Sequence, residues 1–489
     1  MQLLRRLSVP LICVGFAATT SCGGGAENED PLIKGDGCTL RPVEGDRVCG
    51  AGLVCDPVAS SDGYVCATPV ELHGQVIDAL STAPLEGALV TALDETGAPV
   101  SDVAVTDLDG NYVLVVAAAR TEDGELAGDS IYTLQAFGYD YQPFPYGVRP
   151  ALPISTTDLV TDDASGTLII DNPTTTVGLL PLPAGERGGA TITGQVGGEL
   201  PGGTLVVAED LPGTTRYGVA DLSGSYTIFN VTPGNGVVKG YRRGLELETA
   251  SVTVAAADLA EVNLAAVAEG DSVTGQVSGQ VSIVNAPGDA VTSVVLVPTS
   301  VFNDVFELGP VPFGLRDPDP GNAVSVSGAF NFEGVPSGTY KVLAAFENDD
   351  LVRDPDVTIG GTTIQEVTLA PGDRVSAEEG FKVTEALEIV SPGAEGPEPV
   401  SGTPTFVFAD DSSEDFYELQ VYDALGTKVW EDLMVPSVSG SKTVEVVYDG
   451  PGLTTGMYYQ FRASSMRDKQ GGITPISRTE DLRGVFVAQ

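Results

Sequence analysis

The chain has 489 residues, with 24 lysines and arginines against 68 aspartates and glutamates, and this net charge of -44 excludes nucleic-acid binding through phosphate neutralisation. Hydrophobic residues make up 42% and charged residues 19%, which is too apolar for a disordered chain and enough for about three or four packed domains. A single histidine excludes zinc sites built on two imidazoles, and 60 glycines with 33 prolines favour an all-β fold of short strands joined by turns.

The first 21 residues have the layout of a secretory signal. Two arginines precede an apolar run, Leu7 to Ala18, that is too short to span a bilayer as a permanent helix. Small residues follow, directly before Cys22. This resembles the signal of bacterial lipoproteins, in which the cysteine is acylated and becomes the first residue of the mature chain. Thr19 departs from the aliphatic residue usual at its position, so an ordinary secretory signal is the alternative.

The resemblance implies a lipid on Cys22, followed by a glycine-rich, acidic tether over residues 22–36. No later stretch reaches eighteen apolar residues, so we expect the lipid to be the only link to the membrane. Gly23 is not the aspartate that retains many lipoproteins in the inner membrane, which favours the outer membrane. The acidic surface repels anionic headgroups, so we expect the body to project from the bilayer.

A small disulfide-stapled segment is predicted for residues 37–67. Exported chains use cysteines in this way, and a segment this short cannot build a core of its own. We predict two disulfides among the four cysteines of this segment. The favoured pairing joins the first cysteine to the third and the second to the fourth, and the other two pairings stay open. A zinc site is the rival interpretation, but the usual C-x2-C knuckle is absent. The cysteines are Cys38, Cys49, Cys55 and Cys66.

Three segments repeat a pattern that predicts tandem modules of one fold. Each starts a strand with a Gly-Gln-Val string and continues to a turn and an aromatic strand, such as Asp107 to Leu114 in the first copy. An Asp-Gly turn before alternating residues is typical of a β-hairpin, so we expect one in each copy. The strings begin at Gly74, Gly194 and Gly275. The modules span residues 70–184, 190–268 and 271–372.

These modules resemble the carboxypeptidase regulatory-like domain, a β-sandwich of the carbohydrate-binding-like fold that is widespread in bacterial surface proteins. The first copy matches best, because Gly74 to Asp78 and Pro84 to Val90 precede its Asp107 turn. The third copy carries an insertion around Phe302 to Pro320. The resemblance implies a fold and says little about function, since one sandwich serves many roles.

Residues 383–489 follow a different pattern and predict a fibronectin type III or Ig-like sandwich. Leu453 lies six residues before Tyr459, an arrangement that resembles the tyrosine corner of such sandwiches. The tryptophan usual on the second strand is missing, and Phe406 or Phe408 takes its place. The sole tryptophan, Trp430, is expected to pack in the core or at an edge.

No catalytic residue, metal site or cofactor is predicted. The sequence lacks the Gly-Lys of a phosphate loop and the G-x-S-x-G elbow of a hydrolase. Asp107 opens a run spaced like a calcium loop, but the twelfth position is Ala118 where such a loop needs glutamate, so a plain turn is favoured. His73 has threonine counterparts in the other copies, which indicates a structural role.

The best candidate binding patch is the stretch from Tyr139 to Pro150, where aromatic residues alternate with prolines. Such rings either stack on sugars or pack beneath the loop. We therefore expect a non-enzymatic envelope lipoprotein whose sandwiches display a binding surface, with a polysaccharide or an envelope protein as partner and no nucleic acid. The alternative is a stalk, spacer or scaffold without a ligand. The patch residues are Tyr139, Tyr141, Phe144 and Tyr146.

Overall fold

The structure is a computed structural model. It describes residues 30–40, 46–162, 164–256, 258–267, 274–284, 292–318, 328–344, 350–356, 363–377, 380–469 and 472–489. In this part of the chain the regular structure is β-strand with short 3-10 helices, and the predicted all-β fold of sandwiches is confirmed. No helix among these residues is long and apolar enough to cross a bilayer. The signal over residues 1–21, Cys22 and the tether as far as residue 29 lie outside the described residues.

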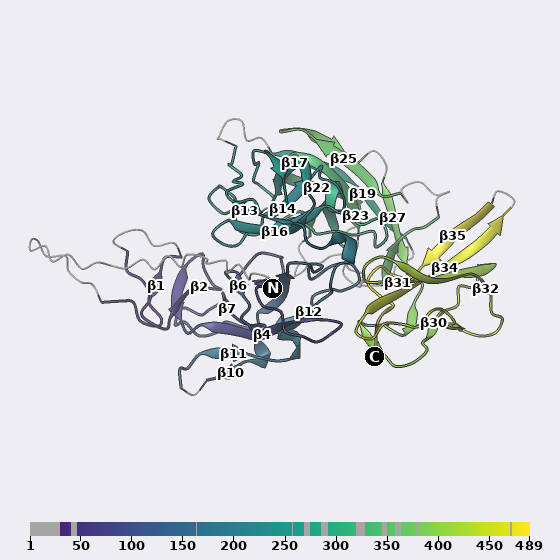
Figure 1. The fold of residues 1–489 in the computed structure, drawn as a ribbon, viewed down its shortest axis with the longest axis horizontal. Helices are drawn as coiled ribbons and strands as arrows, with labels where there is room; N and C mark the ends of the chain where they lie inside the picture. The colour runs from purple at the N-terminus through teal and green to yellow at the C-terminus, as the bar shows by residue number, and fades with distance from the viewer. Residues whose placement is uncertain are drawn as a thin grey trace, which may run out of the picture.

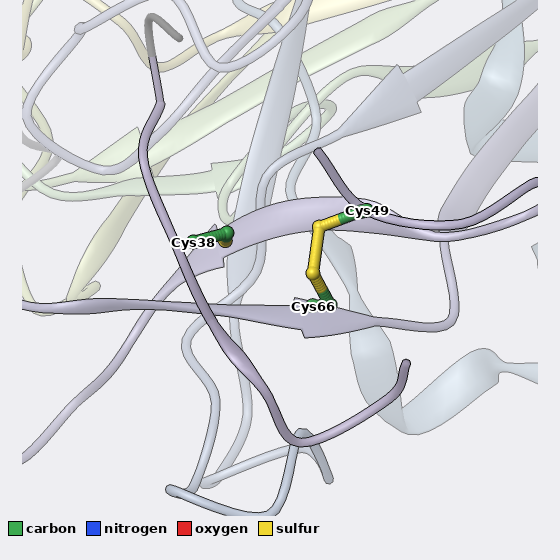
Figure 2. A group of neighbouring side chains, drawn as sticks. All are labelled: Cys38, Cys49 and Cys66. Atoms are coloured by element: carbon green, nitrogen blue, oxygen red, sulfur yellow. A yellow bond between two sulfur atoms is a disulfide. The ribbon is translucent and has the colours of Figure 1, made fainter. Parts of the chain in front are cut away.

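A three-stranded sheet, in the order β1-β3-β2, opens the described chain. Disulfides join Cys38 to Cys55 and Cys49 to Cys66, which confirms both predicted bridges and the favoured pairing. Figure 2 shows the second bridge with Cys38 beside it. Three of these sulfur atoms lie within 4.8 Å of one another, but each is bonded to a sulfur and none is a free thiolate for zinc. The strands are β1 (Gly37–Cys38), β2 (Val54–Pro57) and β3 (Tyr64–Ala67).

The first module packs two sheets face to face. One has the order β10-β11-β4-β12 with β7 also paired to β4, and the other has the order β6-β5-β8-β9. Alternate residues of β7 enter the core between them, as the period of two requires. The strands are β4 (Val70–Asp78), β5 (Leu89–Leu93), β6 (Ala104–Val105), β7 (Asn111–Val116), β8 (Ile131–Phe137), β9 (Ile154–Ser155), β10 (Val160–Thr161), β11 (Leu168–Ile170) and β12 (Thr176–Leu179).

The second and third modules repeat this plan. The second pairs β13 with β16 and places the sheet β15-β14-β17-β18 opposite. Its strands are β13 (Ala190–Gln195), β14 (Leu205–Glu209), β15 (Arg216–Val219), β16 (Ser225–Val231), β17 (Gly234–Tyr241) and β18 (Ala250–Val254). The third pairs β22-β19-β27-β24, with β26 on β19, and β21-β20-β23-β25. Its strands are β19 (Gly275–Val284), β20 (Val294–Pro298), β21 (Arg316–Asp317), β22 (Gly328–Val335), β23 (Gly338–Ala344), β24 (Leu351–Arg353), β25 (Gln365–Leu369), β26 (Arg374–Ser376) and β27 (Phe381–Glu385).

The third module continues beyond residue 372, where the sequence pattern ended it. Strands β26 and β27 pair in parallel with β19, and Phe381 and Val383 of β27 lie in the module's core. The predicted start of the fourth module at residue 383 therefore falls inside the last strand of the third. The sequence gives no sign of this, because parallel pairing joins segments far apart in the chain and needs no turn between them.

The fourth module has a three-stranded and a six-stranded sheet, β28-β30-β33 and β29-β36-β34-β31-β32 with β35 on β34. Phe406 lies at its centre, and its ring centroid is 4.7 Å from that of Phe461. The backbone N–H of Thr454 donates to the Tyr459 hydroxyl at 2.8 Å, which forms the expected tyrosine corner. Trp430 packs against Phe406 at the edge of this core. The strands are β28 (Ile389–Ser391), β29 (Glu398–Val400), β30 (Thr405–Ala409), β31 (Phe416–Asp423), β32 (Lys428–Pro436), β33 (Thr443–Val447), β34 (Tyr458–Lys469), β35 (Gly472–Arg478) and β36 (Val485–Ala488).

The predicted turns form, but they do not close hairpins. The Asp107 carboxylate accepts hydrogen bonds from the backbone N–H groups of Asp109 and Asn111. In the second module the Asp221 carboxylate accepts equivalent bonds from Ser223 and Ser225. In both modules the strand before the turn belongs to one sheet and the strand after it to the other. The hairpin prediction is therefore wrong for the first two copies, because local turn chemistry fixes the reversal of the chain and not the partner of each strand. The segment before Gly328 in the third copy lies outside the described residues.

Strand pairing also shows which Gly-Gln-Val string of the third module corresponds to those of the first two modules. Gly74 lies opposite Tyr112 and Gly194 opposite Tyr226, but the residue opposite Phe330 is Gly279. The sequence contains two Gly-Gln-Val strings four residues apart, and the structural counterpart is the second one rather than the string at Gly275. A slip of four residues keeps the same side chains on the same face, so the pattern alone does not choose between them.

These glycines let an aromatic ring cross the strand. A Cβ at Gly74 or Gly194 would overlap a backbone carbonyl of the neighbouring parallel segment. The Tyr112 hydroxyl passes over Gly74 and donates to the Thr175 carbonyl at 2.6 Å, and Tyr226 makes the equivalent bond to Val262. The glycine of the string is thus required by close approach, and it couples the aromatic strand to the end of its module.

Replacing Gly194 with alanine tests this requirement. We expect Gly194→Ala to lower the free energy of unfolding by about 1–3 kcal/mol, because the added methyl group has no room beside Val262. Gly185→Ala is the matched control, since a Cβ there meets nothing within 4 Å, and its change should stay within about 0.5 kcal/mol. Urea denaturation monitored by circular dichroism measures both, and equal effects of the two substitutions would contradict the packing account.

The modules pack against one another through two apolar clusters that contain residues of more than one module. Figure 1 shows β4 to β12 below β13 to β27, with β28 to β36 to one side. Leu205 and Val207 of β14 belong to an apolar cluster that continues into the third module, whereas Val206 and Ala208 face the core of the second. Phe306 of the third module is fully buried in the core of the fourth. The four modules are therefore docked against one another and are not independent domains. We refer to this docked arrangement as the block.

Candidate functional site

The disulfide-stapled segment is fixed to the first module by a buried ion pair. Arg120 is 1% exposed, and its Nε donates to the Asp56 carboxylate at 2.8 Å. Its Nη2 donates to the Thr68 carbonyl at 2.7 Å. Backbone bonds link Arg120 to Pro57 and Ala59. An arginine with this many partners holds the disulfide-stapled segment in one orientation relative to the first module. The segment is therefore a fixed extension of that module.

The predicted aromatic patch does not form one platform. Tyr139 is 45% exposed, but its hydroxyl donates to the Gly189 carbonyl at 2.9 Å and its ring meets Phe229 of the second module edge to face. Tyr141 turns inward and donates to Asp78 at 3.0 Å. Burial, aided by this carboxylate, raises the pKa of Tyr141 to about 12, so the hydroxyl remains a donor at neutral pH.

The other two patch residues also make internal contacts. The Phe144 ring lies under the guanidinium of Arg149, 5.2 Å from its centroid. The Tyr146 hydroxyl accepts from Asn303 of the third module at 3.1 Å. Of the two interpretations that the sequence left open, packing beneath the loop describes most of these contacts. The loop Tyr139–Pro150 reaches all the other modules and forms what we term the junction.

Arg149 joins the first module to the fourth at this junction. Its guanidinium lies between the rings of Phe144 and Tyr458, with centroid distances of 5.2 and 5.1 Å, and Nη2 donates to the Gly178 carbonyl. Burial lowers the pKa of Arg149 to about 10, so the charge persists at neutral pH and strengthens both ring contacts. Arg149 is buried, and the sequence analysis did not identify it because an isolated arginine carries no periodic signal.

The insertion of the third module docks against the junction through Phe306. Its ring leaves no space for a side chain at Gly147 of the first module, where a Cβ would come within 2.9 Å. Arg462 of the fourth module covers the same ring, 5.6 Å from its centroid, and donates to the Val305 carbonyl. One phenylalanine thus contacts three modules at once.

An ion cluster lies beside Phe306. The Glu307 carboxylate accepts from Arg353 of its own module at 2.9 Å and from Arg478 of the fourth module at 2.6 Å. Burial acts to raise the pKa of Glu307, but the two guanidinium charges and their hydrogen bonds outweigh it and bring the pKa to about 2. Burial raises the pKa of the neighbouring Asp481 in spite of Arg478. The cluster therefore favours docking of the third and fourth modules while Glu307 is ionised.

Hollows lie at the junction. One of about 180 Å³ is bounded by Tyr141, Tyr146 and residues of every module. Others, of about 720 and 750 Å³, lie between the first and fourth modules, and both include Arg149. In the first hollow the Thr214 hydroxyl donates to the Glu186 carboxylate at 3.0 Å. His73 is placed elsewhere, on β4, where its ring contacts Glu71 at 2.8 Å.

The Glu307 cluster makes docking sensitive to acid. A carboxyl whose folded pKa is lowered adds stability above its ordinary value of 4.5, and this is lost as the pH falls toward about 2. We expect Glu307→Gln to reduce the free energy of unfolding by roughly 3 kcal/mol at neutral pH, with the variant and native curves converging near pH 2. Glu366→Gln, which breaks an exposed ion pair with Lys341, is the control. It should change the free energy of unfolding by less than about 1 kcal/mol. Denaturant titrations from pH 7 to pH 2 measure this, and curves that stay parallel would contradict it.

No family model matches the chain, and no curated protein matches it. Among solved structures, a streptococcal ancillary pilin is 13% identical with a TM-score of 0.16, covering 64% of this chain and 98% of its own. Two B repeat units of the collagen-binding protein of Staphylococcus aureus are 10% identical with a TM-score of 0.18, covering 86% and 99%. The major pilin subunit of Bacillus cereus is 10% identical with a TM-score of 0.16, covering 64% and 99%. Scores this low leave function to be inferred from the chain's own residues.

Proposed function

We propose that this chain is a non-enzymatic lipoprotein of the cell envelope, whose four sandwiches form one rigid scaffold that presents a fixed surface to an envelope partner. The observation that carries the proposal is the burial of apolar side chains between modules. Phe306 is fully buried at a contact of three modules. Docking through a core of this kind holds domains in one relative orientation, as a scaffold needs.

The sheet β15-β14-β17-β18 supports rigidity over flexibility. Alternate residues of β14 are buried on opposite faces, one face in its own module and one against the third. A spacer made of independent beads would expose Leu205 and Val207 to water. At about 25 cal/mol per Å² of apolar surface, covering that face gives a strong preference for the docked arrangement.

The anchor proposed for this scaffold is the lipid on Cys22. The disulfide-stapled segment comes directly after the tether, and Arg120 ties that segment to the first module. A lipid at Cys22 would therefore attach a rigid body to the membrane through a short acidic tether. The net charge of -44 favours projection from an anionic bilayer. We propose the outer membrane as its location, because Gly23 is not the aspartate that retains many lipoproteins in the inner membrane.

A surface platform for polysaccharide is the second candidate, and the structure offers it less support. Phe144, Tyr141 and Tyr146 are each occupied by contacts within the block, and Tyr139 alone of the four patch residues is exposed. Stacking on an extended sugar chain needs several exposed rings in a row. An envelope protein is therefore the partner that we favour.

Removing the Phe306 ring tests the scaffold. We expect Phe306→Ala to lower the free energy of unfolding by about 3–5 kcal/mol and to separate the fourth module, because a cavity replaces a fully buried ring. Small-angle X-ray scattering should show a larger radius of gyration, and proteolysis should cut near residue 387. Val311→Ala, an exposed position of the same insertion, is the control. An unchanged radius of gyration in Phe306→Ala would count against the rigid-block proposal.

Replacing Cys22 tests the anchor. In a bacterial host that acylates lipoproteins, we expect the native chain in the membrane fraction and Cys22→Ser in the soluble fraction, because the proposed anchor is the lipid on Cys22. Cys13→Ser is the matched control, since Cys13 belongs to the proposed signal and its loss should leave the membrane fraction unchanged. Mass spectrometry of the N-terminal peptide identifies the acyl groups. A native chain found soluble and without acyl groups would favour ordinary secretion.

A further inference from the structure

We propose that an uncovered sheet face of the first module binds the envelope partner, and that this partner is a protein with an apolar surface bordered by lysine and arginine. This rests on the scaffold function proposed above, and it names the surface that the scaffold presents. The face is the outer side of the sheet β10-β11-β4-β12, in which β7 also pairs with β4. We term it the β4 face. Its apolar residues are Val113, Val115, Val160 and Ile169.

Strand register places these side chains next to one another. Val115 lies opposite Glu71, and Glu71 lies opposite Ile169 on its other side. Ile169 in turn lies opposite Val160, so a row of three aliphatic residues and one carboxylate crosses four strands. Successive residues of a strand point to opposite faces, and the neighbours of this row fill the core, so the row itself lies on the outside. Those core residues are Leu72, Leu114, Val116 and Ile170.

The apolar side chains of the β4 face are open to solvent. Val160 is 68% exposed, Val113 51% and Val115 45%. Figure 1 shows β4, β10 and β11 on the side of the first module that faces away from β13 to β17. Neighbouring apolar side chains that stay exposed on a folded domain mark a surface for interaction with another molecule.

The position of Val115 is apolar in the other modules only where a neighbour covers it. Aligning the modules on the ring opposite each string glycine makes Phe229 and Glu333 its counterparts. Phe229 is covered by Tyr139 of the first module, with ring centroids 6.3 Å apart. Glu333 is exposed and polar. Val115 combines the apolar side chain with exposure, as a surface that awaits a partner would.

The protein already uses outer sheet faces of this kind to dock its own modules. On the opposite side of the first module, Phe137 of the sheet β6-β5-β8-β9 meets Tyr217 of the second module edge to face, with centroids 6.0 Å apart. Leu205 and Val207 on the outer face of the second module join the cluster of the third. The β4 face has the same apolar character, so a flat apolar surface of another protein can pack on it in the same way.

The charge around the β4 face selects the partner. Residues 70–78, 104–116 and 158–179, which build this sheet, contain aspartates and glutamates but no lysine or arginine. Glu71 lies on the face itself, and Asp109 and Asp162 lie in turns at the ends of β7 and β10. Basic residues around a partner's apolar surface would complement these carboxylates. A second copy would bring like charges together, an anionic bilayer would repel them, and a small molecule needs a concave site.

Photo-crosslinking in the native host tests the face. The full-length chain carries p-benzoylphenylalanine in place of Val115 or, as the matched control, in place of Val447. Val447 is also a valine exposed on a strand, at 63%, but it lies on β33 of the fourth module. We expect an adduct with one envelope protein at Val115 and none at Val447. Mass spectrometry identifies that protein and its crosslinked peptide, which should lie in an apolar surface bordered by lysine and arginine.

Binding of the purified, crosslinked protein to residues 23–489 then measures the contribution of the face. Val113→Asn combined with Val115→Glu gives the first module the residues that the third has at these positions. We expect this double variant to weaken the Kd about tenfold or more, because the contact would desolvate an unpaired carboxylate. Val447→Glu should bind as the native chain does, and both should keep the native circular dichroism spectrum. Association should slow as salt is raised, because opposite charges meet at the border of the contact.

The outcomes separate this proposal from the scaffold function. Absence of an adduct specific to Val115 would overturn the assignment of the face, and so would native-like binding by the double variant. An adduct with a second copy, a lipid or a polysaccharide would also overturn it. Crosslinks to an envelope protein at Val447 alone would move the contact to the fourth module and keep the scaffold function, which the scattering of Phe306→Ala tests independently.

Discussion

The structure depends on apolar sheet faces that their own modules leave uncovered. A two-layer sandwich buries the inner face of each sheet, and the outer face ordinarily meets water. Here the β15-β14-β17-β18 sheet carries Leu205 and Val207 on its outer face, where the third module covers them. Once that face is apolar, the second and third modules have to dock, and the other contacts at the junction follow from the geometry that this docking imposes.

Polar contacts at the junction give the packing its specificity. Arg149 lies between two rings of different modules, and Glu307 joins two arginines from the third and fourth. Replacing a whole buried ion pair with apolar groups of similar volume costs little, because desolvation offsets the attraction, but removing or misplacing one partner leaves an uncompensated charge and is costly. The arrangement therefore penalises any docking that would leave one of these charged groups without its partner. This division of roles suits a body that presents one fixed surface.

Local chemistry was readable from the sequence and long-range pairing was not. The disulfide pairs, the turn at Asp107 and the Tyr459 corner were predicted, because each depends on residues close together in the chain. The partner of each strand was not, so hairpins were expected where the chain crosses between sheets, and the predicted start of the fourth module fell inside β27. The patch at Tyr139–Pro150 was located by its aromatic content. Its role at the junction depends on Phe306 and Asn303, which lie far along the chain and carry no matching signal.

The two-sided burial of β14 has a consequence for biosynthesis. The chain grows from its N-terminus, so the second module is complete before β20 and β23 of the third exist to cover it. During that interval Leu205 and Val207 face solvent on a folded sheet, and the nascent protein exposes an apolar surface that is prone to aggregation. A chaperone that shields this face until about residue 370 has emerged would raise the yield of soluble protein, whereas truncation after the second module would leave a fragment prone to aggregation.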